Sequence, residues 1–336
     1  MDVYFQEAYA SCFSEIEQAE ACKYRFSCAL GEIHYVFLKR SIDSKPHKGY
    51  YDIITPYGYG GPIITKCLGN ESALVRSFSV AFERYCQDNS IVSEFIRFHP
   101  LIRNHETFGE MYRPEFHSYN IAVDISPALD DLWHSFEQKV RKNVNKANRH
   151  SLSVSFVKSG ERIDEFLDIY DSTMDRRNAG KRYCYERSFF EKLHNTLPEN
   201  FCYAFVESNG KVVSSELILL GASGIMHSFL GGTKQDAFEM RPNDFLKYKA
   251  IEWGKVNNFH TYLMGGGPTP QDGVYKYKRS FAPSGICEFY LGKKIWNQEL
   301  YNALCEERNI SRDSTFFPLY RAPKNDEETS SLGNDS

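Results

Sequence analysis

Glycines and basic residues gather near the C-terminal end of the sequence, and they are the best candidates for chemistry. GGGP (265–268) follows a predicted strand, and GVYKYKRSF (273–281) comes a few residues later. Three glycines would leave the end of a sheet uncovered, and Lys276, Lys278 and Arg279 follow on a strand or a short helix. In a strand, Lys276 and Lys278 would share one face. We expect this segment either to stabilise negative charge on a reacting group or to form a solvated basic surface.

A second pair of glycines marks another place where a reaction could be stabilised. Gly231 and Gly232 end a predicted strand, and a helix is predicted to begin near Asn243. Backbone N–H groups exposed there could bind an anion or a developing oxyanion. The chain contains neither G-x-G-x-x-G after a strand nor G-x-x-x-x-G-K-[ST]. Dinucleotide-binding and P-loop folds therefore lose their main support.

The first half of the chain contains a loop rich in tyrosine and glycine, YYDIITPYGYGGP (50–62). Glycine lets a backbone approach a ligand closely, and tyrosine offers an apolar ring with a hydroxyl at its edge. The same residue types also suit a loop that is packed only for shape. The sequence therefore allows both a ligand-binding wall and a structural loop.

Two further segments are basic. KVRKNVNKANR (139–149) contains no acidic residue, and TMDRRNAGKRYCY (173–185) follows it. The basic residues of the second segment are Arg176, Arg177, Lys181 and Arg182. Cations near the end of a helix interact favourably with its dipole, so a solvated basic face is one interpretation. The alternative is a site for the phosphates of a polyanionic substrate, such as a nucleotide or a lipid pyrophosphate.

Candidate general bases and metal ligands are few. No Ser/His/Asp arrangement and no pair of carboxylates stands out. His99, His227, Glu216 and Asp272 lie near predicted strand ends, but a structural role explains each of them better. The nine cysteines include no C-x-x-C pair, so we expect reduced thiols and no metal site.

Length and composition limit the classes of protein to consider. The chain of 336 residues has room for two domains. A formal net charge of −4 argues against a surface built wholly for nucleic acid, so we expect no DNA partner. The N-terminal segment is acidic, unlike a secretory signal, and no apolar run could span a bilayer. We expect a cytoplasmic protein without a transmembrane segment, possible association with the inner face of a membrane being left open.

Two similar sets of predicted elements would position these residues. In the first half, a hairpin (23–40) and a strand (50–54) precede the tyrosine loop, a helix (72–89) and a further strand (91–100). The second half repeats this order of hairpin, strand, glycine-rich loop, helix and strand. The repetition indicates either an internal duplication or a chance likeness of two α/β segments.

The second half begins with three predicted helices. The first is a single helix within 124–150, with Ser126 as its N-cap and Pro127 at the first helical position. Its apolar stripe is Leu129, Trp133, Phe136, Val140 and Val144.

Taken together, these segments resemble the Fem (FemAB-like) family of aminoacyl and peptidyl transferases, within the wider GNAT-like acyltransferase superfamily. The resemblance spans about 24–321 and is carried by YYDIITPYGYGGPI, VRKNVNKAN, FLDIYDSTMDRRNAGKRYCY and LMGGGP…VYKYKRSFAP…FYLGKKIWN. It implies two GNAT-like (acyl-CoA N-acyltransferase-like) domains in tandem, each an α/β domain with a mixed sheet flanked by helices. It also implies a substrate between the domains and an acyl group passed to an amine.

The resemblance implies roles for individual residues as well. A lysine in an F-K-x-x-F-like motif of the family helps to bind or stabilise the reacting group, and YKRSF places it at Lys278. The glycine-rich loop corresponds to TPYGYGGP, and the basic helix end to Arg141 and Lys142. Strict Fem members transfer an amino acid from aminoacyl-tRNA to a peptidoglycan precursor, and relatives found with polysaccharide genes are thought to acylate sugars.

The acyl donor is open at this point. The chain lacks the long coiled-coil insertion that some Fem proteins use with tRNA. The segment GGTKQDAFEMRPND (231–244) also lacks the Q/R-x-x-G-x-G/A pattern by which ordinary GNAT enzymes hold coenzyme A. Both acetyl-CoA and aminoacyl-tRNA are therefore kept as donors, with no tightly bound cofactor.

We predict an acyltransferase that passes an acyl or aminoacyl group to an amine of an amino sugar, a nucleotide sugar or a cell-envelope precursor. The acceptor would be a small molecule or a lipid-linked sugar, and tRNA is a possible partner. The alternatives are an aminoacyl-tRNA-dependent transferase that builds peptidoglycan bridges, and a non-catalytic binding protein for nucleotide- or lipid-linked sugars. The predicted domains are 1–125 and 126–322, followed by a disordered acidic tail, 323–336.

Specific residues are assigned to these roles. The candidate catalytic groups are Lys278 and the backbone of Gly231 and Gly232. The candidate substrate-binding residues are Asp52, Tyr57, Tyr59, Gly60, Gly61, His99, Arg141, Lys142, Arg176, Asn178, Tyr248 and Tyr277. We expect Asp52, Tyr57 and Tyr59 to contact the acceptor and Lys278 to face the acyl group.

Overall fold

The protein is described by a computed structural model that covers residues 1–180, 184–267, 271–310 and 314–323. The chain forms two compact units. The N-terminal unit contains Tyr4–Ser118 together with residues 288–323, and the C-terminal unit contains Met1–Val3 and Tyr119–Cys287. The predicted tail, from residue 324 on, lies outside the described residues.

The predicted end of the second domain is wrong. The predicted start at 126 lies close to Tyr119, but the segment 288–323 belongs to the N-terminal unit instead of completing the second domain. The reason is strand pairing. Strand β12 pairs antiparallel with β5 of the N-terminal unit, with Leu291 opposite Arg97.

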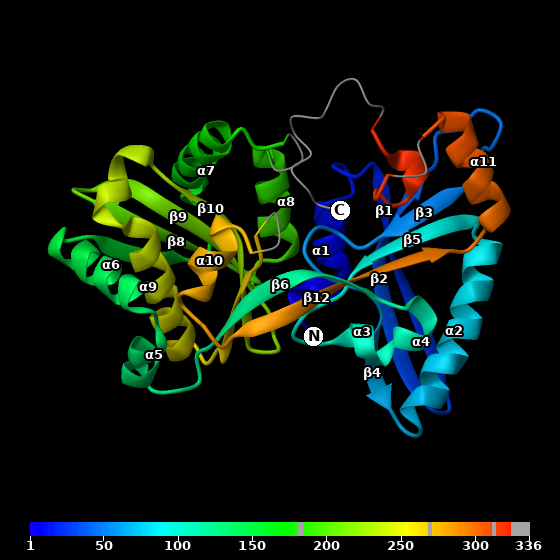
Figure 1. The fold of residues 1–336 in the computed structure, drawn as a ribbon, viewed down its shortest axis with the longest axis horizontal. Helices are drawn as coiled ribbons and strands as arrows, with labels where there is room; N and C mark the ends of the chain where they lie inside the picture. The colour runs from blue at the N-terminus through cyan, green and yellow to red at the C-terminus, as the bar shows by residue number, and fades with distance from the viewer. Residues whose placement is uncertain (181–183, 268–270, 311–313, 324–336) are drawn as a thin grey trace. The chain divides into compact units, whose positions relative to one another are not determined.

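The N-terminal unit is a mixed sheet with one long helix against it (Figure 1). The strand order is β1-β2-β3-β5-β12, with β4 paired to β2. Only β3 and β5 run parallel; the other pairs are antiparallel. Its elements are α1 (Glu7–Cys12), β1 (Ala19–Cys28), β2 (Gly31–Ser41), β3 (Tyr51–Ile54), β4 (Ile63–Cys67), α2 (Glu71–Asp88), β5 (Ile91–Arg97), α3 (Asn104–Thr107), α4 (Gly109–Tyr112), β12 (Ile286–Ile295), α11 (Gln298–Arg308) and η4 (Leu319–Arg321).

Helix α2 shows why the N-terminal unit folds as its sequence predicts. Asn70 caps the helix, its side chain accepting a hydrogen bond from the Ala73 N–H at 2.8 Å. Phe78 and Phe82 stack at 5.4 Å between ring centroids and are fully buried against the sheet. The helix predicted at 72–89 and the hairpin predicted at 23–40 are both confirmed, the hairpin as β1 and β2.

The C-terminal unit is a second mixed sheet, in the order β6-β11-β10-β9-β8-β7. Only β10 and β11 run parallel. In Figure 1, α6 and α9 lie on one face of this sheet and α7 and α8 on the other. Its elements are β6 (Glu115–Asp124), α5 (Leu129–Ser135), α6 (Gln138–Arg149), β7 (Ser153–Val157), α7 (Ile163–Arg177), α8 (Arg187–Thr196), β8 (Phe201–Ser208), β9 (Lys211–Leu220), β10 (Ile225–Thr233), η3 (Gln235–Met240), α9 (Pro242–Val256), β11 (Thr261–Gly265) and α10 (Gly273–Arg279).

The single long helix predicted within 124–150 is wrong, because the chain breaks into α5 and α6. Phe136 between them is extended, at φ −68° and ψ 150°, and its ring is buried against Phe281 and Tyr248. Ser126 is not the N-cap; α5 begins after Ala128, without a side-chain cap. Packing of one aromatic ring thus outweighs the helical pattern.

The two units share one order of elements. In the N-terminal unit, an antiparallel β1-β2-β3 sheet is followed by α2 and the parallel strand β5. In the C-terminal unit, an antiparallel β8-β9-β10 sheet is followed by α9 and the parallel strand β11. The tandem α/β architecture predicted from the sequence is confirmed. None of the helices in the described ranges is long and apolar enough to cross a bilayer.

Candidate active site

The parallel strands of the C-terminal unit separate part of the way along their length. β10 and β11 pair at three positions, the last being His227 opposite Leu263. Beyond this point β10 continues to Thr233 paired with β9 on its other side, with a bulge between Ser228 and Leu230. Polar side chains from three strands and a helix meet where β10 and β11 part.

A buried ion pair lies at this point. The Lys247 ammonium on α9 donates to Glu216 Oε1 at 2.6 Å, to Ser228 Oγ at 2.8 Å and to the Tyr262 hydroxyl at 3.2 Å. The Tyr262 hydroxyl in turn donates to Glu216 Oε1 at 2.7 Å. Lys247, Glu216 and Tyr262 are all buried. A buried ion pair is stable only when its polar atoms are satisfied, and within the described part of the chain only Glu216 Oε2 in this group has no hydrogen-bond partner.

Lys278 lies on the short helix α10, which begins where Asp272 accepts a hydrogen bond from the Tyr275 N–H at 2.7 Å. The Lys278 Nζ donates to the Gly266 carbonyl, just beyond β11, at 2.5 Å. Although the side chain is partly exposed, the protein surrounds its amine. This desolvation, together with the positive charge of Lys247, lowers the pKa of Lys278 to about 7. Both the ammonium and the neutral amine are therefore populated near neutral pH.

The predicted residue Tyr277 links α10 to α9. Its hydroxyl accepts a hydrogen bond from Asn243 Nδ2 at 2.9 Å, and desolvation raises the pKa of this hydroxyl well above its usual value. Asn243 and Lys247 are four residues apart and so lie on the same face of α9. Lys278, next to Tyr277, is thus held beside the helix face that bears Lys247.

The start of α9 is poorly suited to binding an anion. Its first residue, Pro242, has no N–H to donate. Asp244 follows in the first turn, and its buried carboxylate accepts a hydrogen bond from Asn143 Nδ2 at 3.1 Å. Burial raises the pKa of this carboxyl. A phosphate would meet a carboxylate where a helix N-terminus usually offers free N–H groups.

Gly231 and Gly232 lie at the end of a strand, as expected: β10 ends one residue later, at Thr233, and the two glycines pair with Glu216 and Ser215 of β9. A Cβ on Gly231 would lie 2.5 Å from the Ser215 carbonyl oxygen, and one on Gly232 would lie 2.2 Å from Thr173 Oγ1. The two glycines therefore permit close packing of β10 against β9 and α7.

Arg176, at the end of α7, lies near the free end of β10. It donates to the Thr233 carbonyl at 2.9 Å, and its guanidinium stacks over the Phe238 ring at 4.9 Å. Asn178 is the exposed C-cap of α7, with φ 49°. Lys181 and Arg182, the rest of this predicted basic cluster, lie outside the described residues.

The other predicted residues of the C-terminal unit have structural contacts. Arg141 donates to the carbonyls of His134 and Phe136 and so closes the end of α5. Lys142 is exposed on α6. Tyr248 packs edge-on against Trp133, with ring centroids 5.2 Å apart. These contacts fit the solvated or packed alternatives better than a phosphate site.

In the N-terminal unit, the prediction that Asp52 contacts the acceptor is wrong. Its carboxylate is fully buried, with Oδ1 2.7 Å from Arg40 Nε and Oδ2 bonded to Arg321. The Tyr320 hydroxyl also donates to Oδ2, at 3.1 Å. Both oxygens are therefore used in holding the unit together.

The tyrosine loop continues the pairing of β3 with β5. The Thr55 N–H donates to Phe95 O at 3.1 Å and the Gly60 N–H to Arg97 O at 2.7 Å. Gly60 is buried, its carbonyl accepting a hydrogen bond from Asn104 Nδ2 at 2.8 Å. The structural alternative thus describes this part of the loop better than a ligand-binding wall.

The remaining predicted residues of the N-terminal unit are packed as well. Gly61 is buried at φ 94°, which favours glycine, while Tyr57 is half-buried. The Tyr57 carbonyl accepts a hydrogen bond from the Tyr9 hydroxyl at 2.7 Å. The Tyr59 ring packs at 5.2 Å from that of His99, whose Nδ1 accepts hydrogen bonds from two backbone N–H groups.

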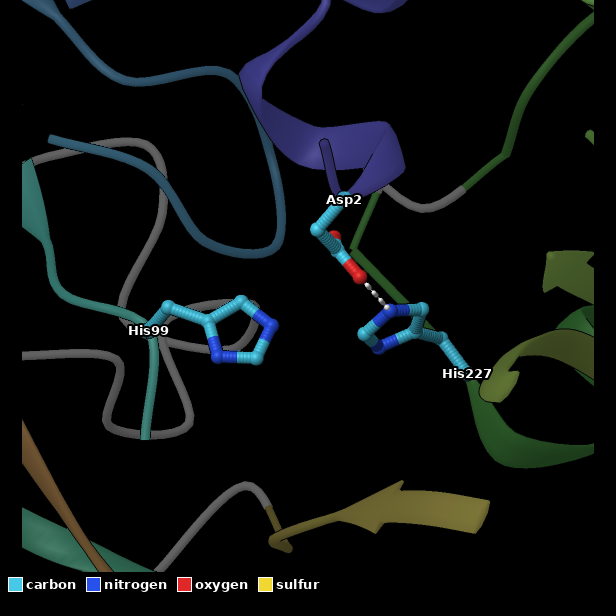
Figure 2. A group of neighbouring side chains, drawn as sticks. All are labelled: Asp2, His99 and His227. Carbon is cyan, nitrogen blue, oxygen red and sulfur yellow. Dashed lines mark hydrogen bonds and ion pairs between the residues drawn. The ribbon is translucent and has the colours of Figure 1, made fainter. Parts of the chain in front are cut away.

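His227, considered as a base from the sequence, is held by the start of the chain. Figure 2 shows the Asp2 carboxylate directed at the His227 ring, and Asp2 Oδ2 lies 2.8 Å from His227 Nε2. Both residues are buried. This bond attaches Met1–Val3 to the C-terminal unit.

Sequence reasoning missed Lys247, Ser228 and Tyr262. Lys247 was detectable, because it is one turn before the apolar residues Ala250 and Ile251 on the same face of a predicted helix. Glu216, in turn, is the one charged residue of the apolar strand segment VVSSELILL (212–220). A lysine and a glutamate in two apolar segments indicate a buried pair.

Comparisons with known proteins agree with this architecture. Residues 134–279 match the family model described as an acetyltransferase (GNAT) domain. No curated protein shows significant sequence similarity to the chain. Among solved structures, the chain is similar to FemX, with TM-score 0.69, 13% identity, and coverage of 90% of this chain and 94% of that one.

Two further structures have the same fold. One is a conserved protein of unknown function from Bacteroides thetaiotaomicron, with TM-score 0.56, 12% identity and coverage of 87% of this chain and 91% of that one. The other is the C-terminal domain (DUF2156) of a putative lysylphosphatidylglycerol synthetase from Agrobacterium fabrum, with TM-score 0.55, 13% identity and coverage of 87% and 88%. The predicted resemblance is thus confirmed: the chain is an acyltransferase that carries a GNAT domain and has the FemX-like fold.

Proposed function

We propose that this protein transfers an acyl or aminoacyl group to the amine of an amino sugar, a nucleotide sugar or a cell-envelope precursor. The observation that carries the proposal is Lys278, whose amine is held at the end of β11 with a pKa of about 7. The GNAT domain match includes this residue. The proposal places the protein in the cytoplasm, where both donor classes occur.

The chemistry needs one cationic donor near the reacting carbonyl. The amine attacks the acyl carbon, and the carbonyl oxygen becomes an oxyanion. The oxyanion then reforms the carbonyl of the new amide as the donor's ester oxygen or thioester sulfur leaves with the bonding electrons and takes up the proton that the amine loses. Protonated Lys278 would donate to the oxyanion. Because the site is desolvated, such a hydrogen bond is worth more than in water.

The start of α9 favours aminoacyl-tRNA over acetyl-CoA as the donor. Pro242 removes an N–H and Asp244 adds a carboxylate at the position where the diphosphate of coenzyme A would need donors. Arg176 and the exposed Arg177, at the end of α7, supply positive charge for the phosphates of a nucleic acid or of a lipid- or nucleotide-linked acceptor.

The role of Lys278 is tested by its substitution. Replacement by alanine should lower kcat by about 10² to 10³, the usual effect of removing one oxyanion donor. Lys276→Ala, which removes an exposed lysine from the same helix, is the matched control and should leave kcat unchanged. A folded Lys278→Ala variant with the rate of the wild type would reject the assignment.

The dependence of the rate on pH shows whether Lys278 acts as the ammonium or as the neutral amine. Since the ammonium is the active form, the rate should fall as pH rises through about 7, the pKa of Lys278. A rate that instead rises through this pH would make Lys278 a proton acceptor.

The donor is tested by offering labelled acetyl-CoA and labelled aminoacyl-tRNA separately, with amino sugars, nucleotide sugars and peptidoglycan precursors as acceptors. We expect label to move from aminoacyl-tRNA and this transfer to stop after RNase treatment. Transfer from acetyl-CoA alone would contradict the argument from α9.

A further inference from the structure

The Lys247–Glu216 pair is a buried pair of charges in the core of the C-terminal unit. Burying two charges costs free energy that apolar side chains of similar volume would not cost. Lys247 nevertheless uses all three ammonium hydrogens, one each on Glu216, Ser228 and Tyr262. Such a fully bonded ammonium is fixed in position. The pair therefore calls for a role beyond packing.

We propose that Lys247 and Glu216 are positioning residues for Lys278, fixing where its amine lies and how much positive charge it carries during acyl transfer. The consequence for catalysis rests on the proposed function, whereas the effect on the Lys278 amine itself does not. Neither residue of the pair needs to touch the substrate in this role.

The geometry ties Lys278 to both elements that hold the pair. Tyr277, its neighbour on α10, is bonded to Asn243, which shares a face of α9 with Lys247. The Lys278 amine itself is bonded to Gly266, on the segment that leaves β11 a few residues after Tyr262. Displacement of the pair would therefore move Lys278 both through α9 and through the segment that follows β11.

Four described charges act on the Lys278 amine. Lys247 on α9 and Arg177 on α7 are positive and lower its pKa, whereas Glu216 on β9 and Asp272 before α10 are negative and raise it. Lys276 and Arg279, the other charges of α10, are exposed and so are screened by solvent. Lys247 and Glu216 thus act on Lys278 in opposite directions.

This opposition provides the test. Lys247→Met removes a positive charge, so the pKa of Lys278 should rise by roughly one unit; Glu216→Gln should lower it by a similar amount. The first readout is the titration of the Lys278 ε-carbon by NMR in protein labelled with ¹³C-lysine, with Lys278→Arg for assignment. The second is the pH-rate profile, whose alkaline limb should move in the same two directions.

The controls separate charge from packing. Lys249→Met breaks the ion pair in which Lys249 Nζ lies 2.6 Å from Glu252 Oε2, also on helix α9. This variant should leave the pKa of Lys278 unchanged. The double variant Lys247→Met/Glu216→Gln should return the midpoint toward that of the wild type. Glu216→Gln keeps the shape of the side chain, so it decides the outcome if Lys247→Met does not fold.

The outcomes distinguish this inference from the proposed function. Shifts in the same direction for both single variants, or no shift in folded protein, would overturn it. Opposite NMR shifts support the coupling even if no amine is acylated, in which case the proposed function fails alone. If transfer occurs but the titration of Lys278 stays fixed, the proposed function stands and this inference fails.

Discussion

The two units build the same arrangement of strands and helix but treat the end of their parallel strand pair differently. In the N-terminal unit, Thr55 and Gly60 extend the pairing of β3 with β5, and Gly60 bridges to Phe98. In the C-terminal unit, the pairing of β10 with β11 stops at His227. In the N-terminal unit, backbone of the loop after β3 therefore continues the pairing with β5. In the C-terminal unit, side chains instead occupy the place where β10 and β11 separate.

Their buried glutamates differ in the same way. Glu94 of the N-terminal unit accepts hydrogen bonds from the Tyr112 hydroxyl at 2.9 Å and the Trp296 indole at 3.0 Å. Glu216 of the C-terminal unit is paired with the Lys247 ammonium. The donors to Glu94 are uncharged aromatic side chains, an arrangement that serves packing. The Lys247–Glu216 pair keeps charge inside the core beside a lysine with a perturbed pKa, as functional sites often do.

The largest effect expected in the N-terminal unit concerns Asp52. Replacing Asp52 by alanine leaves Arg40 and Arg321 without their carboxylate, and should destabilise the protein by about 3 to 5 kcal/mol in urea denaturation. The transfer rate per folded molecule should be unchanged, in contrast to Lys278→Ala. Asp43→Ala, at an exposed acid of the same unit, is the control. A higher KM for the acceptor in folded Asp52→Ala would restore the predicted binding role.

A smaller and pH-dependent effect is expected at Glu94. Burial raises the pKa of its carboxyl from 4.5 to about 7, so its contribution to stability is complete below pH 4.5 and is lost as pH rises through 7. The wild type should lose up to about 3 kcal/mol over this range. Glu94→Gln cannot ionise, so its stability should depend less on pH, with exposed Glu110→Gln as control. Parallel stability curves would show that Glu94 is not buried as described.

The smallest effect concerns the attachment of the N-terminus to the C-terminal unit. Asp2→Asn replaces a charged acceptor of His227 by a neutral one, and should cost about 1 kcal/mol. Hydrogen exchange should become faster around β10 and stay unchanged in α2. Exchange that becomes faster equally in both would mean that Asp2 acts on the chain as a whole.

The sequence predicted local elements well and long-range polar contacts poorly. The hairpin of β1 and β2 and the helix α2 follow from alternation and helical spacing, which neighbouring residues determine. Lys278 was found because a family motif surrounds it. The Lys247–Glu216 bond joins residues 31 apart on different elements, so local patterns indicate a buried charge in each segment but not that the two residues are bonded to each other. The role of the tyrosine loop was ambiguous in the sequence because glycine serves close packing and ligand approach equally well.

The nesting of one unit within the sequence of the other has a consequence during synthesis. β5 leaves the ribosome long before its partner β12, which follows the whole of Tyr119–Cys287. Until then, one edge of β5 is without its neighbour and is open to pairing with other chains. The nascent N-terminal unit should therefore depend on chaperones until β12 emerges, and a chain cut after residue 287 should aggregate.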